Sequence, residues 1–249
     1  MTYCLSMLLD TGLVFLSDSR TNAGIDHVST FRKTTVFEKP GERVLVLLTA
    51  GNLAATQSVC SLLNEDVQRG SEHPSLMSCT TMHDAACLVG DALRQIHERD
   101  GEALQKFGYD FNPAIILGGQ IRGEKPRLFN IYAAGNFIEA TPETTYFQIG
   151  ESKYGKPIID RVIRRTSSLA EAVKCALVSM DSTIRSNLSV GLPLDLVVVK
   201  RDDLRVARHA SIDQNNPYFR QISNGWGDAL RHAFVQLPDH DWLGRRPSH

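Results

Sequence analysis

The pattern of hydrophobic and polar positions along the chain alternates between blocks of strands and blocks of helices. Before residue 50, short runs rich in apolar, β-branched and aromatic residues are separated by turn-forming residues, which predicts strands. These strands cover residues 3–9, 12–17, 34–37 and 43–48. The run from 44 to 48 is apolar at every position, which indicates a strand that is buried on both faces.

Amphipathic segments with capping residues predict two pairs of helices. In the first pair, Asn52 is a suitable N-cap for a helix that ends near residue 69, and Thr81 with Asp84 forms a capping-box pattern for the next helix. The second pair is predicted at 151–164 and from residue 168, where Ser168 and Glu171 repeat the capping-box pattern. The remaining runs predict strands at 113–117, 127–132, 136–139, 145–149, 194–200 and 204–209.

This order of elements predicts an α+β fold. Two sheets, each covered on its outer face by a helix pair, would bury every apolar stripe in a four-layer αββα sandwich. At 249 residues the chain is long enough for one such domain, which we expect to span residues 2–211. We interpret residues 212–249 as a C-terminal extension that either packs against the domain or contacts another subunit. The aromatic residues of this extension are Tyr218, Phe219, Trp226, Phe234 and Trp242.

Composition excludes several classes of protein. The chain is 42% hydrophobic and 22% charged with a formal net charge of -1, so no overall charge attracts it to nucleic acid or to an anionic membrane. Its first ten residues lack the basic start of a signal peptide, and no run approaches the ~20 apolar residues of a membrane span. The 5 scattered cysteines, an odd number, are typical of reduced core thiols. We therefore expect a cytoplasmic protein with neither nucleic acid nor membrane as a partner.

The second residue, Thr2, is the first candidate for chemistry. A threonine hydroxyl is a weak nucleophile because it keeps its proton at neutral pH, and an α-amine on the same residue can accept that proton. An α-amine has a pKa of roughly 7.7–8.0, so part of it is neutral at pH 7. Because threonine is small enough for an aminopeptidase to remove Met1, we expect Thr2 to become the first residue without a propeptide. Many chains begin Met-Thr, so the prediction depends on residues further along.

Three later residues are candidates for completing a site around Thr2. Lys33 would lower the pKa of the hydroxyl and the amine by its positive charge, and Asp18 would hold that ammonium in place if neighbouring strands bring both to Thr2. Gly51 lies between a buried strand and a capped helix, where its N–H is a candidate oxyanion donor. The alternatives are a solvated ion pair on a surface strand and an ordinary strand-to-helix turn.

Taken in order, these residues resemble the proteasome β-type family of N-terminal nucleophile (Ntn) hydrolases. The resemblance rests on Thr2, the Asp-Ser-Arg-Thr motif at 18–21, Lys33 and Ala50-Gly51, and it extends over about residues 2–210. Strings at 1–4, 17–24, 29–33 and 149–155 are similar to Anbu, the bacterial ancestral β-subunit branch of that family. The resemblance implies a proteasome β-like sandwich, a threonine peptidase that acts on peptides, and self-association into a ring or an open helical assembly.

The resemblance also shows two departures. Members of the family have Gly-Ser-Gly where this chain has Gly150-Glu151-Ser152, and at 186–191 they have an aspartate where this chain has Ser186. A neutral hydroxyl cannot stabilise an ammonium as a carboxylate does, although Glu151 could supply charge from another direction. The predicted catalytic residues are Thr2, Asp18, Lys33, Gly51, Ser189 and Ser152. The predicted substrate-binding residues are Thr21, Thr49 and Ala50.

Three functions stay open on these residues. The first is amide hydrolysis by acyl transfer on Thr2, the second is a self-assembling scaffold or peptide-binding particle with little turnover, and the third is an amidase for a small amide. Ser186 is the residue that motivates the scaffold. The amidase stays open because the depth of the substrate pocket cannot be derived from the sequence. We expect no cofactor and no metal: Cys79, His83 and Cys87 have a spacing that could place zinc ligands on one helix, but zinc needs three or four of them. Nothing in the sequence identifies an ATPase partner.

Overall fold

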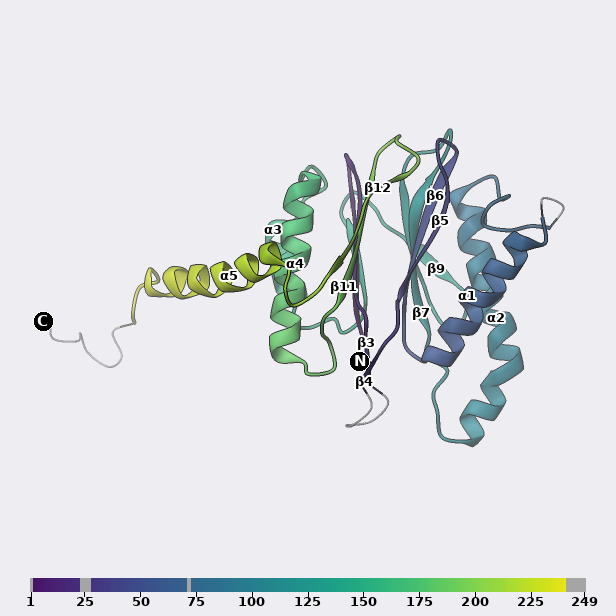
Figure 1. Ribbon diagram of the computed structural model, residues 1–249, viewed down its shortest axis with the longest axis horizontal. Coiled ribbons are helices and arrows are strands. Elements are labelled where there is room, and N and C mark those ends of the chain that lie inside the picture. The colour runs from purple at the N-terminus through teal and green to yellow at the C-terminus, as the bar shows by residue number, and fades with distance from the viewer. Residues whose placement is uncertain (1, 23–27, 71–72, 241–249) are drawn as a thin grey trace, which may run out of the picture.

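Two five-stranded antiparallel sheets pack face to face in the computed structural model, which describes residues 2–22, 28–70 and 73–240. Figure 1 shows α1 and α2 on one outer face of the sandwich and α3 and α4 on the other. The helix bounds are Leu53–Gln68 for α1, Met82–Lys106 for α2, Lys156–Val162 for α3 and Leu169–Ser186 for α4. The four-layer αββα prediction is therefore confirmed.

The first sheet places the start of the chain between two strand ends. Its order is β10-β1-β2-β11-β12, and Tyr3 lies opposite Gly150 on one side while Cys4 lies opposite Ser17 on the other. The segment before β1 therefore lies beside the end of β2 and the end of β10. The strands of this sheet are β1 Tyr3–Leu9, β2 Gly12–Asp18, β10 Tyr146–Gly150, β11 Leu194–Lys200 and β12 Val206–Ile212.

The second sheet carries the strand that leads into α1. Its order is β5-β6-β7-β8-β9, and its central strands are buried because one face packs on α1 and α2 and the other on the first sheet. The chain then crosses to the first sheet for β10, a change of sheet that the strand prediction does not contain. The strands of this sheet are β5 Thr34–Lys39, β6 Arg43–Ala50, β7 Ala114–Ile121, β8 Arg127–Ile131 and β9 Phe137–Glu139.

Three of the predicted helix starts, those of α1, α2 and α4, are confirmed by their caps. The side chain of Asn52 accepts a hydrogen bond from the Ala55 N–H at 3.2 Å, which satisfies one of the free donors in the first turn of α1. Both predicted capping boxes form, with Thr81 at the start of α2 and Ser168 at the start of α4.

Two predicted boundaries differ from the structure, and one hairpin is missing from the prediction. The predicted 151–164 helix begins too early, because Pro157 lies in the first turn of α3 and residues 151–155 form a loop. The predicted 204–209 strand begins later, at Val206, because Leu204 has φ 49° and belongs to the turn. A short hairpin of β3 Arg20–Asn22 and β4 Val28–Thr30 separates β2 from β5 and is absent from the prediction.

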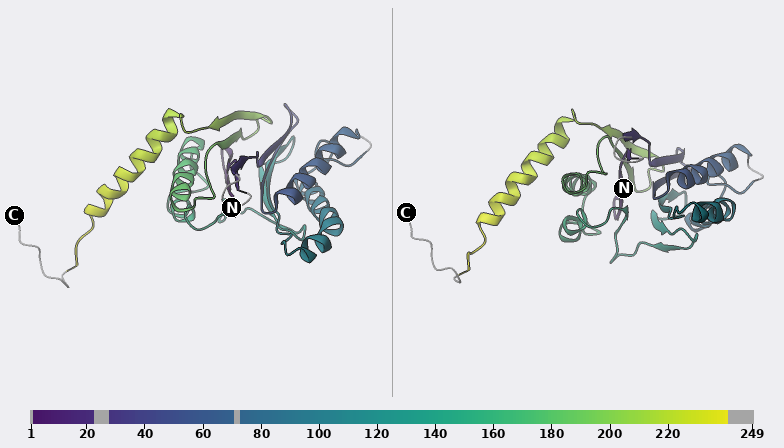
Figure 2. Two further views of the ribbon diagram at one scale, coloured as in Figure 1. Left: turned by 60° about the horizontal axis from the view of Figure 1, so that its bottom comes forward. Right: turned by 90° about the horizontal axis from the view of Figure 1, so that it is seen from below.

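The C-terminal extension contains a long helix that the sequence prediction missed. This helix, α5, spans Pro217–Val235 and is capped by Asn216, whose side chain accepts from the Phe219 N–H at 3.0 Å. Both views in Figure 2 show α5 leaving the body of the molecule beside α4. The asparagine-proline pair at 216–217 was the signal for this helix start.

None of the helices in the described part of the chain combines the length and the apolar character that a membrane span requires. All 5 cysteines are free thiols; three of them are buried, and Cys60 and Cys87 are partly exposed. The described residues contain no group of three or more histidine, cysteine or acidic side chains arranged to hold a metal ion.

Candidate active site

The segment around Thr2 is held from both sides by its neighbouring strands. The Thr2 carbonyl accepts a hydrogen bond from the Glu151 N–H at 2.6 Å, just beyond the end of β10. On the other side, the Tyr3 N–H donates to Asp18 Oδ1 at 3.0 Å, at the end of β2. These two bonds set the position of the Thr2 backbone, and Thr2 itself is partly exposed.

Asp18 and Lys33 form a buried ion pair beside this segment. Lys33 Nζ lies 2.8 Å from Asp18 Oδ1, and the two side chains are 5% and 0% exposed. The ammonium also donates to the Arg20 carbonyl at 2.6 Å. A pair this deeply buried is not the solvated surface pair that the sequence left open. The structure thus brings Asp18 and Lys33 together, and Asp18 contacts the backbone of the residue that follows Thr2.

Burial raises the pKa of Asp18 above its ordinary value, although the positive charge of Lys33 and hydrogen bonds from Lys33, Tyr3 and Gly191 oppose this. Lys33 and these N–H groups take the place of water as partners of the carboxylate and favour its charged form. In return it holds the ammonium of Lys33 in a fixed position next to the start of β1. A fixed positive charge there would favour the neutral form of a Thr2 amine, which is the form that accepts a proton.

Cys4 is a second potential nucleophile near the site, and its surroundings argue against that role. Its thiol is buried and points toward the Thr49 carbonyl, with Sγ at 3.5 Å from the oxygen. Burial raises the pKa of this thiol well above its ordinary value, with a smaller opposing effect from Lys33. Cys4 therefore stays protonated, whereas Thr2 is accessible.

Gly51 follows β6 in a conformation that requires glycine. Its φ of 97° is unfavourable for other residues, and a Cβ at this position would clash with the Asn112 carbonyl oxygen. The Gly51 N–H has no acceptor within the described residues, so it can donate to a ligand. Gly51 is tied to the ion pair through Thr49, whose N–H donates to the Lys33 carbonyl at 2.9 Å.

The predicted serines lie on two loops, of which the one with Ser152 follows the Glu151 N–H that binds the Thr2 carbonyl and the one with Ser189 follows α4. Ser152 is exposed, and its N–H donates to the Glu151 carboxylate at 2.9 Å. The N–H of Ser189 donates to Asn187 Oδ1 at 3.0 Å, and Asn187 in turn donates to Glu151. Sequence reasoning noted Glu151 without placing it in the site and missed Asn187, although the departure at 150–152 marks this position.

The predicted substrate-binding residues lie in β3 and at the end of β6. Thr21 lies in β3, where it pairs with Ser29. Thr49 is buried, and its hydroxyl lies 3.4 Å from the Lys33 carbonyl, to which it donates. Ala50 is 5% exposed and packs in the layer between the two sheets. Thr49 thus holds the backbone of Lys33 in place.

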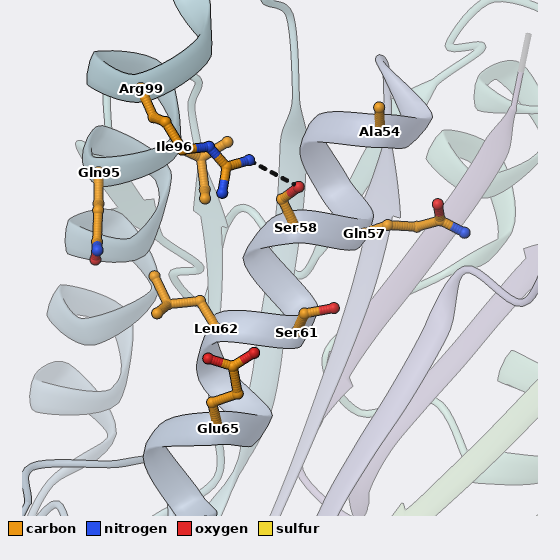
Figure 3. A pocket seen from close by; sticks show the side chains of 9 residues that line it. All are labelled: Ala54, Gln57, Ser58, Ser61, Leu62, Glu65, Gln95, Ile96 and Arg99. Carbon is orange, nitrogen blue, oxygen red and sulfur yellow. Dashed lines mark hydrogen bonds between the residues drawn. The ribbon is translucent and has the colours of Figure 1, made fainter.

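A groove on the outer face of the molecule is distinct from this site. Figure 3 shows it between α1 and α2, where Arg99 donates to the Ser58 hydroxyl at 3.2 Å across the gap. The groove has a volume of about 390 Å³, and all its lining residues come from these two helices. No residue of β1, β2 or the 151–153 loop lines it, so the Thr2 site is not part of this groove.

Comparison with known proteins places this geometry among proteasome-type subunits. No protein-family model matches the chain. The structure of Anbu (ancestral β-subunit) from Yersinia bercovieri is 53% identical with a TM-score of 0.90, over 96% of this chain and 99% of that one. The structure described as the helical assembly of the Anbu complex from Pseudomonas aeruginosa is 47% identical with a TM-score of 0.92, over 98% of this chain and 100% of that one.

Curated relatives are more distant. A proteasome subunit beta from Haloquadratum walsbyi is 26% identical over 172 residues, which is 68% of this chain and 62% of that protein. The chain therefore matches less than two thirds of the length of this relative. The predicted resemblance to proteasome β-type proteins, and to their ancestral branch, is confirmed by these comparisons.

Proposed function

This chain belongs to the Anbu (ancestral β-subunit) family, and on that premise we propose that it is an Ntn hydrolase that cleaves amide bonds with Thr2 as the nucleophile. Peptides are the proposed substrates. The observation that carries the proposal is the buried Asp18–Lys33 pair, whose shared oxygen Asp18 Oδ1 also accepts from the Tyr3 N–H. An ion pair that only stabilised the fold could lie anywhere in the core, whereas this one contacts the residue next to the predicted nucleophile.

The proposed reaction begins once Met1 has been removed and the Thr2 amine is free. Thr2 Oγ attacks the amide carbonyl, and the Thr2 amine accepts the hydroxyl proton through a water molecule. The Gly51 N–H donates to the oxyanion, and the amine then returns the proton to the departing nitrogen. Water attacks the resulting ester, which releases the acid and restores the Thr2 hydroxyl. Lys33 and Asp18 do not react; they set the charge around the amine.

The same premise includes self-association into a homo-oligomeric particle. A relative has been solved as a helical assembly, and α5 offers a surface for such contacts. The apolar side of α5 starts with Phe219, which is buried against the body, and continues at helical spacing to Leu230 and Phe234, which are 50% and 76% exposed. A helix side that is apolar beyond its own domain is typical of a surface that another subunit covers. Whether the particle closes or winds depends on the geometry of that contact.

Intact mass and active-site labelling test the proposed chemistry. We expect purified protein to lack Met1 and to gain the mass of one β-lactone or epoxyketone probe on Thr2. Thr2→Ala is the matched control, and we expect it to assemble normally without taking up probe. Retention of Met1, or no labelling of correctly processed protein, would contradict the proposed nucleophile.

A particle with little turnover is the second candidate function. The observation that favours it is Ser186, which is exposed at the end of α4 and brings no carboxylate to the site. Labelling of Thr2 together with slow hydrolysis of a peptide library would support this candidate. Rapid release of small amides but not of peptides would instead support an amidase.

A further inference from the structure

A continuous chain of hydrogen bonds runs from the Thr2 carbonyl to Ser189, and its two side chains are Glu151 and Asn187. We infer that Glu151 and Asn187 are positioning residues, which lock the loop after β10 to the loop after α4 and so hold Thr2 and Ser189 in a fixed relation. This inference rests on the proposed function of Thr2. It assigns to Glu151 a role in the reaction that involves no contact with the substrate.

The first half of the chain is the Glu151 residue itself. Its N–H donates to the Thr2 carbonyl at 2.6 Å, while its carboxylate accepts from the N–H groups of Ser152 and Lys153 at 2.9 and 2.8 Å. Glu151 is 6% exposed, so a carboxylate without such partners would be strongly unfavourable there. The Glu151 carboxylate thus binds the N–H groups of its own loop, and the Glu151 backbone binds Thr2.

The second half of the chain is Asn187, whose amide is held in one orientation. Asn187 Nδ2 donates to Glu151 Oε2 at 2.9 Å, and Asn187 Oδ1 accepts from the Ser189 N–H at 3.0 Å. A carboxylate accepts only and an N–H donates only, so rotating the amide by 180° would break both bonds. Asn187 therefore transmits the position of Glu151 to the loop that carries Ser189.

The loop after α4 also contacts the Asp18 side of the site. The Arg20 guanidinium donates to the Leu188 carbonyl at 3.3 Å, and the Ser19 N–H donates to the Pro193 carbonyl at 2.9 Å. Residues 187–193 thus join the Glu151 loop to the strand end that holds Asp18. Movement of this loop would change both sides of the Thr2 segment together.

The Glu151 carboxylate is charged at neutral pH. Burial raises its pKa, but the hydrogen bonds from Lys153, Asn187 and Ser152 outweigh burial and hold the pKa below its ordinary value. A hydrogen bond to a charged acceptor is stronger than one between neutral groups. The bond between Glu151 and Asn187 is therefore stronger than a bond between two neutral amides would be.

Exchanging the two side-chain types tests the positioning pair. In Glu151→Gln, every orientation of the two amides places an amide nitrogen against another donor, which is Asn187 Nδ2, the two loop N–H groups or the Ser189 N–H. In Asn187→Asp, two carboxylates face each other. In the double variant Glu151→Gln/Asn187→Asp, the new amide at position 151 accepts from the loop and donates to the new carboxylate at position 187. That carboxylate still accepts from the Ser189 N–H. Every bond of the chain is then restored, with the charge moved to position 187.

We expect each single variant to label with the β-lactone probe about tenfold or more slowly than wild type, because small displacements at a reacting centre have effects of this size. The double variant should recover most of that loss. Glu143→Gln, which removes an exposed carboxylate from a distant turn, is the control and should label at the wild-type rate. The inference is wrong if the single variants label at the wild-type rate. It is also wrong if the loss of labelling rate in the double variant equals the combined losses of the two single variants.

Hydrogen exchange separates this inference from the proposed function. We expect amides at 188–191 and 152–153 to exchange faster in both single variants and to regain protection in the double variant. If wild-type protein does not label at all, the proposed nucleophile fails, and the exchange pattern still decides whether Glu151 and Asn187 hold the two loops. Unchanged exchange in the single variants would overturn the positioning pair whatever the labelling shows.

Discussion

At the scale of single residues, one carboxylate oxygen organises the proposed site. Asp18 Oδ1 accepts from both the Tyr3 N–H and the Lys33 ammonium, so it connects the backbone beside Thr2 to the positive charge that lies just before β5. Both side chains are almost fully buried, and the pair has therefore given up hydration. Each of the two charges is stabilised inside the protein by the opposite charge of its partner.

Removing one member of this pair should destabilise the protein more than removing both. We expect Asp18→Asn or Lys33→Met alone to lower the free energy of unfolding by about 3–5 kcal/mol, since a buried charge is left without a partner. The double variant should recover much of this loss because no buried charge remains. Chemical denaturation measures the free energies. A double variant less stable than either single variant would contradict this account of the pair.

The same three variants should separate stability from reactivity. We expect the double variant to remain unlabelled by the β-lactone probe even where its stability recovers, because the positive charge next to Thr2 is gone. Conversely, labelling of the double variant at the wild-type rate would show that Lys33 has no part in activating Thr2.

The lowered pKa of Glu151 predicts how its contribution to stability depends on pH. The pKa of Glu151 is lower in the folded state than in the unfolded state, so the unfolded chain binds the proton more tightly. The charged carboxylate therefore stabilises the folded state, and this effect is fully present above the unfolded pKa. The effect is lost as the pH falls through the folded pKa. We expect the stability difference between wild type and Glu151→Gln to be constant at about pH 6–7 and to shrink progressively below about pH 4.3. A difference that grows on acidification would have the wrong sign.

At the scale of elements, the end of β10 is shaped by Gly150. Its φ is 81°, and a Cβ at this position would clash with the Thr2 carbonyl oxygen that Glu151 binds. The strand therefore ends in a residue that allows close approach to the start of β1. Any larger residue would push the Thr2 segment away from the 151–153 loop.

A pair of glycine substitutions separates this close approach from backbone strain. Gly123 has a similar φ of 91° but no atom within 4 Å of a built Cβ, so Gly123→Ala should lose only the roughly 1–2 kcal/mol of left-handed strain and label normally. Gly150→Ala should lose about 1–3 kcal/mol more from the clash and label slowly. Thermal unfolding and probe labelling measure the two effects. Equal behaviour of the two variants would contradict a special role for Gly150.

At the scale of the whole molecule, α5 is a helix whose exposed apolar side chains have no packing partner that accounts for them in the single chain. Its first turns dock on the body through Phe219 and through a 2.8 Å hydrogen bond from Arg185 to the Ser223 hydroxyl. Its later turns lie outside the sandwich in both views of Figure 2. Leu230 and Phe234 are 50% and 76% exposed, so much of their apolar surface faces water in the single chain, and they fit a role in assembly.

Polar substitution of these two residues should release subunits without unfolding them. We expect Leu230→Ser/Phe234→Ser to reduce the native mass while its far-ultraviolet circular dichroism stays unchanged. Phe107→Ser is the control, because Phe107 is 80% exposed at the end of α2. Native mass spectrometry checks both variants. An unchanged particle in the double variant would show that the apolar side of α5 is not an assembly contact.

The sequence by itself determined the elements and most of the layers. Alternating and continuous apolar runs predicted both β1 and β6, and capping residues such as Asn52 and Ser168 marked the helix starts, because these signals act within a few residues of chain. The sequence named Asp18 and Lys33 as partners on the condition that strand ends meet; β2 and β5 belong to different sheets, so the packing of the two sheets decides their contact. The prediction placed the start of α3 too early and missed α5, the β3–β4 hairpin and the change of sheet before β10.

Only the tertiary structure decided which distant segments meet at Thr2. The move of β10 into the first sheet brings Gly150 and Glu151 to the start of β1, and no local pattern encodes that change of sheet. Asn187 reaches Glu151 only because α4 covers the same sheet, so its importance is invisible in sequence order. Hydrogen bonds between loops depend on side-chain orientation and burial. Those properties exist only once the two sheets and their helices have packed.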